Sequence, residues 1–130
     1  MLKQLILCSW ILLTIISCNE KGKEKPCIPA TLKKNIIGTW TGYLESMPTQ
    51  KDEISFVENG TFSETEGILF GKRNEPVMVW KAEKDSLKIS GKFNNNTSAV
   101  YVFSSLTNTC DSIVLDLQGI DKIFLKRKKD

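Results

Sequence analysis

Between residues 38 and 127, apolar and polar residues alternate in short stretches, and turn-forming residues interrupt them about every ten positions. In Gly38–Leu44, for example, Trp40 and Leu44 fall on one face of an extended chain and Thr39 falls on the other. The same alternation predicts strands over 54–57, 61–66, 77–82, 87–91, 100–104, 112–117 and 122–126. Residues 68–70 would extend or restart the strand predicted over 61–66. One helical turn is expected within 30–36.

The connections between these strands decide the architecture. No helical pattern lies between them, so a parallel sheet is disfavoured, and a sandwich or a barrel is left. Asn59-Gly60 predicts a two-residue hairpin with a type I′ turn, in which both residues have positive φ. Successive short turns favour an up-and-down meander, and closing the sheet removes its exposed edges. We therefore expect residues 30–130 to form an all-β, antiparallel up-and-down β-barrel of about eight strands.

The amino terminus has the pattern of an export signal. Lys3 precedes an apolar run of about 12 residues, which is shorter than the roughly 20 that a membrane-spanning helix needs. Residues 1–17 are therefore predicted to be a signal peptide. The junction Ile-Ile-Ser-Cys resembles the bacterial lipobox, which implies cleavage before Cys18 and its modification with diacylglycerol and acyl chains such as palmitate. An ordinary secretory signal that contains a cysteine is the alternative.

Residues 18–29 follow as a predicted linker, because their alternating lysines, glutamates and prolines cannot bury enough apolar surface to fold alone. The lipobox resemblance implies a lipoprotein attached to a membrane of the bacterial cell envelope, with the outer membrane as the expected location. The basic run 126–129 could touch anionic lipid head groups, although a solvated strand end is the favoured interpretation.

The chain contains four cysteines. Cys8 would leave with the signal peptide and Cys18 would carry the lipid, so Cys27 and Cys110 remain. An exported protein meets an oxidising compartment, where such a pair most often forms a disulfide. Two free thiols are the alternative.

Composition excludes several chemistries. Histidine is absent, which removes histidine bases, Ser-His triads and histidine-ligated metals, and a net charge of +3 gives no indication of nucleic-acid binding. Glu64 and Glu66 share a strand face but are expected to be solvated. We therefore predict no catalytic residue, no metal site, no cofactor and no enzymatic activity.

Two short motifs allow a modification. Asp85-Ser86-Leu87 and Asp111-Ser112-Ile113 match an O-glycosylation sequence that some Gram-negative bacteria use. Aspartate and serine are also common in hairpin turns, so glycosylation of Ser86 or Ser112 stays open.

Several motifs indicate a family. Gly38-Thr39-Trp40, at the start of the first strand, resembles the lipocalin signature Gly-x-Trp. Small lipocalin-like lipoprotein domains of Gram-negative bacteria share further motifs, seen here as FVENGTF (56–62), DSLKI (85–89) and IFLKR (123–127). The resemblance covers roughly residues 36–127. It implies that Trp40 closes one end of the barrel beneath a basic residue of the last strand, Arg127 or Lys126.

The resemblance also implies a binding function. A small apolar ligand would lie between the aromatic side chains of Trp80, Phe56, Phe62 and Tyr101. The alternative is a protein-interaction module such as an enzyme inhibitor.

Overall fold

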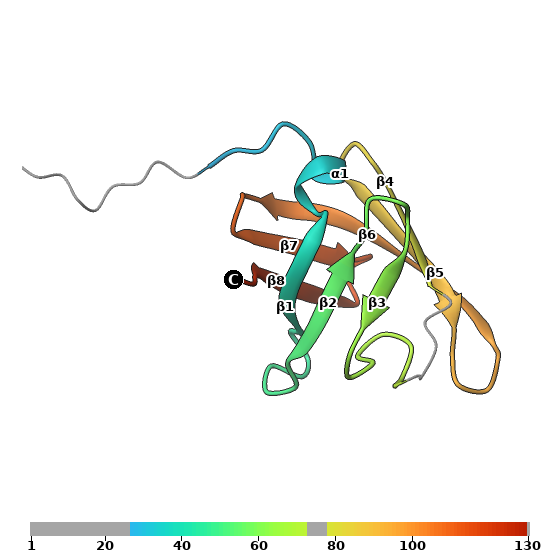
Figure 1. The fold of residues 1–130 in the computed structure, drawn as a ribbon. Helices are drawn as coiled ribbons and strands as arrows, with labels where there is room; N and C mark the ends of the chain where they lie inside the picture. Colours follow the sequence, from blue (N-terminus) through green and yellow to red (C-terminus); the bar gives the residue numbers. More distant parts are fainter. Residues whose placement is uncertain (1–26, 73–77, 130) are drawn as a thin grey trace, which may run out of the picture.

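The computed structural model describes residues 27–72 and 78–129, which form one eight-stranded antiparallel sheet (Figure 1). The predicted signal peptide, Cys18 and most of the predicted linker lie outside these residues. The described elements are α1 (Leu32–Asn35), β1 (Gly38–Leu44), β2 (Asp52–Phe56), β3 (Phe62–Glu64), β4 (Val79–Glu83), β5 (Ser86–Lys92), β6 (Ser98–Asn108), β7 (Ser112–Leu117) and β8 (Asp121–Arg127).

The sheet curls into a nearly closed barrel. Its strand order is β3-β2-β1-β8-β7-β6-β5-β4. Consecutive strands therefore pair, except β3 and β4 at the two edges, and β1 also pairs with β8. The two edge strands meet at one bridge between Thr61 and Val79, where the Phe62 N–H donates to the Met78 carbonyl over 3.0 Å. The predicted all-β up-and-down barrel is confirmed.

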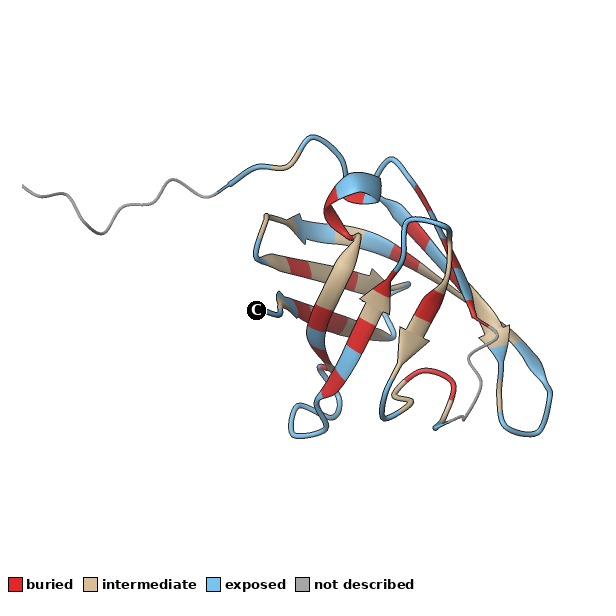
Figure 2. Cartoon of the chain, viewed as in Figure 1, coloured by how far each residue is buried: buried red, intermediate tan, exposed pale blue. Residues whose placement is uncertain are grey.

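Alternation along the strands places one face of the sheet in the core, as the buried bands in Figure 2 show. In β1 the Trp40 side chain is fully buried while Thr41, its neighbour, is exposed. Phe62, Phe103 and Leu87 are also fully buried. The hydrophobic effect acting on this inward set is what closes the sheet.

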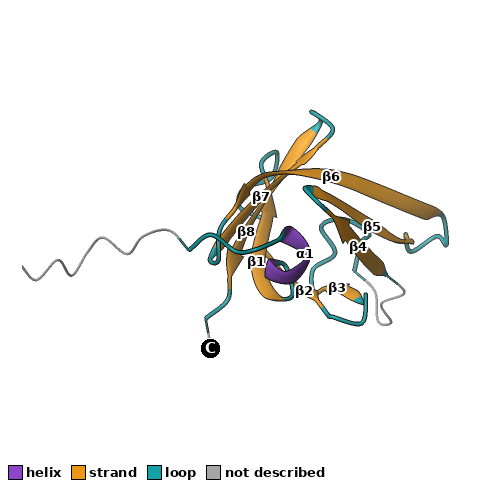
Figure 3. Ribbon diagram, turned by 90° about the horizontal axis from the view of Figure 1, so that it is seen from above, coloured by secondary structure: helices purple, strands orange, loops and turns teal. Residues whose placement is uncertain are grey.

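The short helix α1 covers one end of the barrel (Figure 3). The Thr31 hydroxyl caps the helix by accepting a hydrogen bond from the Lys34 N–H. The side chain of Leu32, the first residue of the helix, is buried in the core.

A disulfide between Cys27 and Cys110 joins the segment before α1 to the β6–β7 turn, with the two Cα atoms 5.3 Å apart. The predicted disulfide and the predicted helical turn are therefore both present. No helix among the described residues is long and apolar enough to cross a bilayer.

Two local predictions are wrong. In the β2–β3 hairpin only Gly60 has positive φ, so the turn is not type I′. Its loop has three residues, with Gly60 N–H donating to the Val57 carbonyl, and the Asn59 side chain accepts from the Thr61 N–H instead of adopting a left-handed backbone. Residues 68–70 form a turn and not a strand, because their backbone N–H groups bind the carboxylates of Asp52 and Glu64.

Candidate functional site

Trp40 and Arg127 close the α1 end of the barrel. The Arg127 guanidinium carbon lies 4.1 Å from the centre of the Trp40 ring, and the indole N–H donates to the Ile36 carbonyl over 2.8 Å. The guanidinium also donates to the backbone carbonyls of Asn35 and Cys110, over 2.6 and 2.7 Å. The family resemblance implied that either Arg127 or Lys126 would lie against Trp40, and the structure places Arg127 there.

A cavity of about 810 Å³ opens beside this closed end, between the segment that carries α1 and the β4–β5 hairpin. Leu32, Ile37, Trp80 and Ala82 contribute apolar side chains to its lining. The other lining residues are mostly polar or charged: Pro29, Ala30, Thr31, Lys33, Lys34, Glu58, Glu83, Lys84, Asp85 and Asn108. The Trp80 indole is held in place, because its N–H donates to the Val57 carbonyl over 2.8 Å.

The four residues predicted to line a ligand site all point into the barrel, where they pack in its core. Phe56 contacts Phe62 and Trp80 edge to face, with ring centres 5.2 and 5.7 Å apart. Tyr101 is joined to this group through Phe70, whose ring centre is 5.1 Å from that of Tyr101 and 6.3 Å from that of Phe62. Of the four, Trp80 alone is part of the cavity lining. A row of aromatic rings therefore runs from this cavity towards the opposite end of the barrel.

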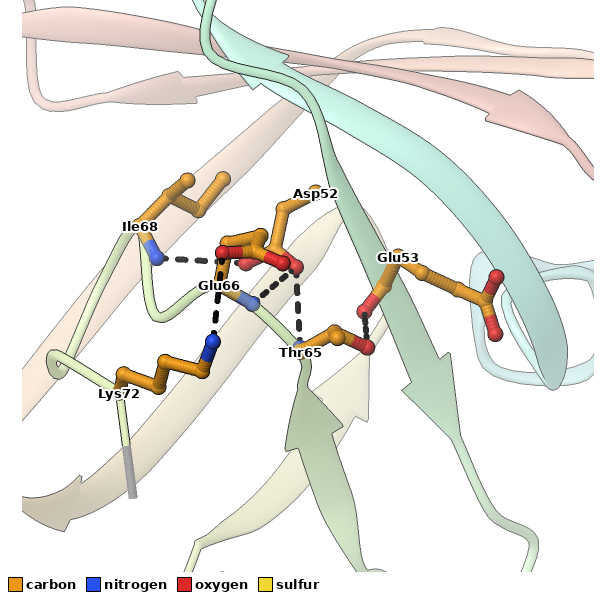
Figure 4. A network of polar contacts seen from close by, with 6 residues as sticks. All are labelled: Asp52, Glu53, Thr65, Glu66, Ile68 and Lys72. Carbon is orange, nitrogen blue, oxygen red and sulfur yellow. Dashed lines mark hydrogen bonds and ion pairs between the residues drawn. The ribbon is translucent and has the colours of Figure 1, made fainter.

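At that opposite end, residues 65–71 form a short loop that we call the plug. Figure 4 shows the Asp52 carboxylate, which accepts hydrogen bonds from the N–H groups of Thr65, Glu66 and Ile68 over 2.9, 2.7 and 3.2 Å. Asp52 is only 2 % exposed. These bonds satisfy backbone groups that a strand would pair with a neighbour, which is why this segment can leave the sheet.

A second carboxylate holds the rest of the plug. Glu64 accepts from the N–H groups of Leu69 and Phe70 over 3.1 and 2.8 Å, and both of these side chains are buried. The Tyr101 hydroxyl donates to the Leu69 carbonyl over 2.7 Å. Two carboxylates and one phenol thus fix the plug against the barrel.

Burial changes the acidity of this group. The pKa of Glu64 is raised to about 7. Desolvation by burial is the main cause, the hydrogen bonds from the N–H groups of Phe70 and Leu69 oppose it, and the charge of Asp52 adds a smaller increase. Burial and the Glu64 charge also raise the pKa of Tyr101. The expectation that Glu64 is solvated is therefore wrong. Glu66 does lie at the surface, 3.8 Å from the Lys72 ammonium.

Sequence reasoning missed Asp52 and Glu64, although a signal was present. Asp52 shares the inward face of β2 with Ile54 and Phe56, and Glu64 shares that of β3 with Phe62. When a carboxylate alternates onto the same strand face as core residues, it is placed where it must be buried, and a buried carboxylate needs hydrogen-bond donors.

The possible glycosylation sites and the basic run lie at or near the protein surface. Ser86 is exposed and Ser112 is half-buried. In the basic run, Lys128 forms an ion pair with Glu53. Among the described residues, no group of three or more histidine, cysteine, aspartate or glutamate side chains is placed to hold a metal ion.

The fold defines a lipocalin-like domain: an up-and-down barrel of eight strands with a helical turn before β1. No protein-family model matches the chain, and no protein of curated function matches it significantly. Among solved structures, it is similar to a lipocalin-like protein from Bacteroides thetaiotaomicron VPI-5482, with 27% identity over 72% of this chain and 97% of that one, and a TM-score of 0.46. It is also similar to a psychrophilic marine protease MP inhibitor, with 14% identity over 74% and 98% of the two chains, and a TM-score of 0.46.

Proposed function

We propose that this chain is a lipid-anchored, lipocalin-like protein of the bacterial cell envelope that binds a small apolar ligand without chemical turnover. The observation that carries the proposal is the open cavity at the α1 end. Its volume of about 810 Å³ lies within the range of small-molecule sites, roughly 300–1,000 Å³. Apolar side chains would provide affinity, and the charged groups among the lining residues would orient a polar end of the ligand.

The composition supports binding over catalysis. Histidine is absent from the whole sequence, and Cys27 and Cys110 are joined to each other. The common nucleophile and base pairs of enzymes are therefore missing among the described residues.

The anchor is proposed from the sequence around Cys18. Only a short segment separates Cys18 from Cys27, which the disulfide fixes at the α1 end. Because about eight residues extend no further than roughly 30 Å, this end, with its cavity, would stay within that distance of the lipid surface. Mass spectrometry of the membrane fraction from the native host should show an acylated peptide that begins at Cys18. A soluble, unmodified protein would contradict the anchor.

The ligand site is tested with the uncharged fluorescent probe N-phenyl-1-naphthylamine. The disulfide, all described strands and the described core lie within 27–129, so residues 19–130, exported behind an ordinary cleavable signal, should fold without lipid. Ala82→Leu adds carbon atoms to the cavity lining and should weaken probe binding about tenfold. The control is Val79→Leu, which enlarges the opposite, 58 % exposed face of the same strand.

Equal binding by both variants and the unmodified protein would remove the cavity from the proposal. Native mass spectrometry of protein purified gently from its host gives a second test. A bound small molecule supports the proposal, and an empty cavity with a co-purifying protein would favour the protein-interaction alternative.

A further inference from the structure

We propose that the α1 cavity holds its ligand through the free edge of β4 at Ala82, and that the ligand is an uncharged acylated amino acid. Its amide N–H and the following carbonyl would extend the sheet by one residue, and its acyl chain would lie against the apolar lining. The inference rests on the proposed function, because it names the polar part of the ligand that the same cavity takes.

The outer edge of β4 is paired only at its start. The Trp80 N–H donates to the Gly60 carbonyl over 2.9 Å, next to the bridge between Thr61 and Val79. The β2–β3 hairpin turns back at this point, and β4 continues to Glu83. Among the described strands, β4 is at the edge of the sheet and no other strand runs beside its last residues.

Ala82 presents a hydrogen-bond donor and an acceptor at this edge. In an antiparallel pair the backbone groups of successive residues point alternately to the two sides. The Trp80 N–H points away from β5, so the N–H and the carbonyl of Ala82, two residues further on, do the same. Among the described residues, no hydrogen bond outside the strand pairings involves either group. Ala82 is only 5 % exposed, so both groups have little access to bulk water.

The cavity surrounds this edge. Its lining comes from the segment around α1, from Glu58 in the β2–β3 turn, and from β4 with the turn that follows it. Figures 1 and 3 both show α1 beside this end of β4. Backbone donors and acceptors removed from water need partners, and a single residue of an added strand can bond to both groups of Ala82. A ligand with one acylated amino-acid residue supplies this pair of groups.

The length of the free edge limits the ligand to about one residue. The paired part of β4 lies at one end of this edge, and the turn before β5 lies at the other. A long peptide strand therefore has no continuous edge to pair with, whereas a single amide-bearing residue does. The acyl chain of such a ligand would contact Leu32, Ile37 and Trp80.

The charges of the lining favour an uncharged ligand. Three ammonium groups and three carboxylates contribute to it: Lys33, Lys34, Lys84, Glu58, Glu83 and Asp85. Because these charges balance, the lining as a whole attracts neither an anion nor a cation. A neutral amide is therefore the polar group that fits both the edge and its surroundings.

The test compares two ligands that differ at one position. N-Octanoylglycinamide carries the amide N–H, and its ester analogue octanoyloxyacetamide has an oxygen atom in place of that N–H. Titration calorimetry with residues 19–130 should show the amide binding about fivefold more tightly, because the ester cannot donate to the Ala82 carbonyl. Ala82→Leu should weaken both ligands, and the control Val79→Leu should weaken neither.

Hydrogen exchange followed by NMR reports the contact itself. Without ligand, the Ala82 N–H should exchange faster than the Trp80 N–H, which is bonded to Gly60. Saturation with N-octanoylglycinamide should slow exchange at Ala82 by about tenfold or more and leave exchange at Trp80 unchanged. This measurement needs no substitution, so it does not depend on whether a variant folds.

The outcomes separate this inference from the proposed function. If both ligands bound equally and both were weakened by Ala82→Leu, the cavity would stand and its use of the β4 edge would be refuted. An amide preference without slower exchange at Ala82 would also refute it. Binding of N-phenyl-1-naphthylamine but of neither octanoyl compound would keep the cavity and remove the acylated amino acid, and binding of none of the three would remove both proposals.

Discussion

Replacing Arg127 with methionine tests how the α1 end is held together. The methionine side chain can still pack on the Trp40 ring, but it has no charge and no donor. The substitution therefore removes hydrogen bonds to the carbonyls of Asn35, Ile37 and Cys110 and to the Asn35 side chain. It also removes the cation from the indole face.

The size of the effect follows from these contacts. A hydrogen bond to a charged donor contributes about 1.5–3 kcal/mol, and a cation over an indole about 0.5–2 kcal/mol. The contributions do not add fully, because Arg127 is half-buried and water can reach some of the freed carbonyls. We expect a loss of about 3–4 kcal/mol in the free energy of unfolding, against a total of about 5–15 kcal/mol for a typical domain. The melting temperature should fall by about 15 °C.

Urea unfolding of residues 19–130, followed by the fluorescence of Trp40 and Trp80, measures this loss. Arg127→Lys is the informative companion, because it keeps a cation near Trp40 but cannot reach three carbonyls with one ammonium group. It should lose about half as much stability. If Arg127→Met melted within about 2 °C of the unmodified protein, the claim that Arg127 holds this end together would be refuted.

Three further predictions concern other contacts. Replacing Cys27 and Cys110 together with alanine should lower the free energy of unfolding by about 2–4 kcal/mol, and alkylation before reduction should label neither cysteine in the unmodified protein. Because the pKa of Glu64 is raised in the folded state, its contribution to stability should be fully present below pH 4.5 and should fall by about 1–2 kcal/mol as the pH rises through 7. A Glu64→Gln urea series should lack this fall. Gly67→Ala should speed hydrogen exchange within 65–71 at least tenfold, and unchanged exchange would show that the turn tolerates a Cβ atom.

The sequence was sufficient for the barrel because its strands depend on local alternation. Trp40 and Leu87 are buried where period-two alternation puts them, and the short turns left an antiparallel meander as the simplest topology. The position of Arg127 over Trp40 was implied by the family resemblance, and no periodicity in the sequence indicates it.

The plug could not be predicted because the contacts that form it are distant in the sequence. Ile68, Leu69 and Phe70 have the composition of a strand. Hydrogen bonds that the N–H groups of Thr65, Glu66 and Ile68 donate to the Asp52 carboxylate, 13–16 residues earlier in the chain, help turn this segment away from the sheet. Glu64 was expected to be solvated because its own partners, the N–H groups of Leu69 and Phe70, reach it only when this segment folds back. The α1 cavity was missed for a similar reason, since it forms between segments that meet only in the folded protein.

The Cys27–Cys110 disulfide also decides where a mechanical load would enter the barrel. A pull on the chain before Cys27 would pass through the sulfur atoms to the β6–β7 turn, where Arg127 binds the Cys110 carbonyl. Without the disulfide, the same pull would act on α1 and then on the start of β1, and it would strip that strand from β2 and β8 one hydrogen bond at a time. With it, the load acts across several strands at once, so pulling from this end in an optical trap should require a larger force before reduction than after it.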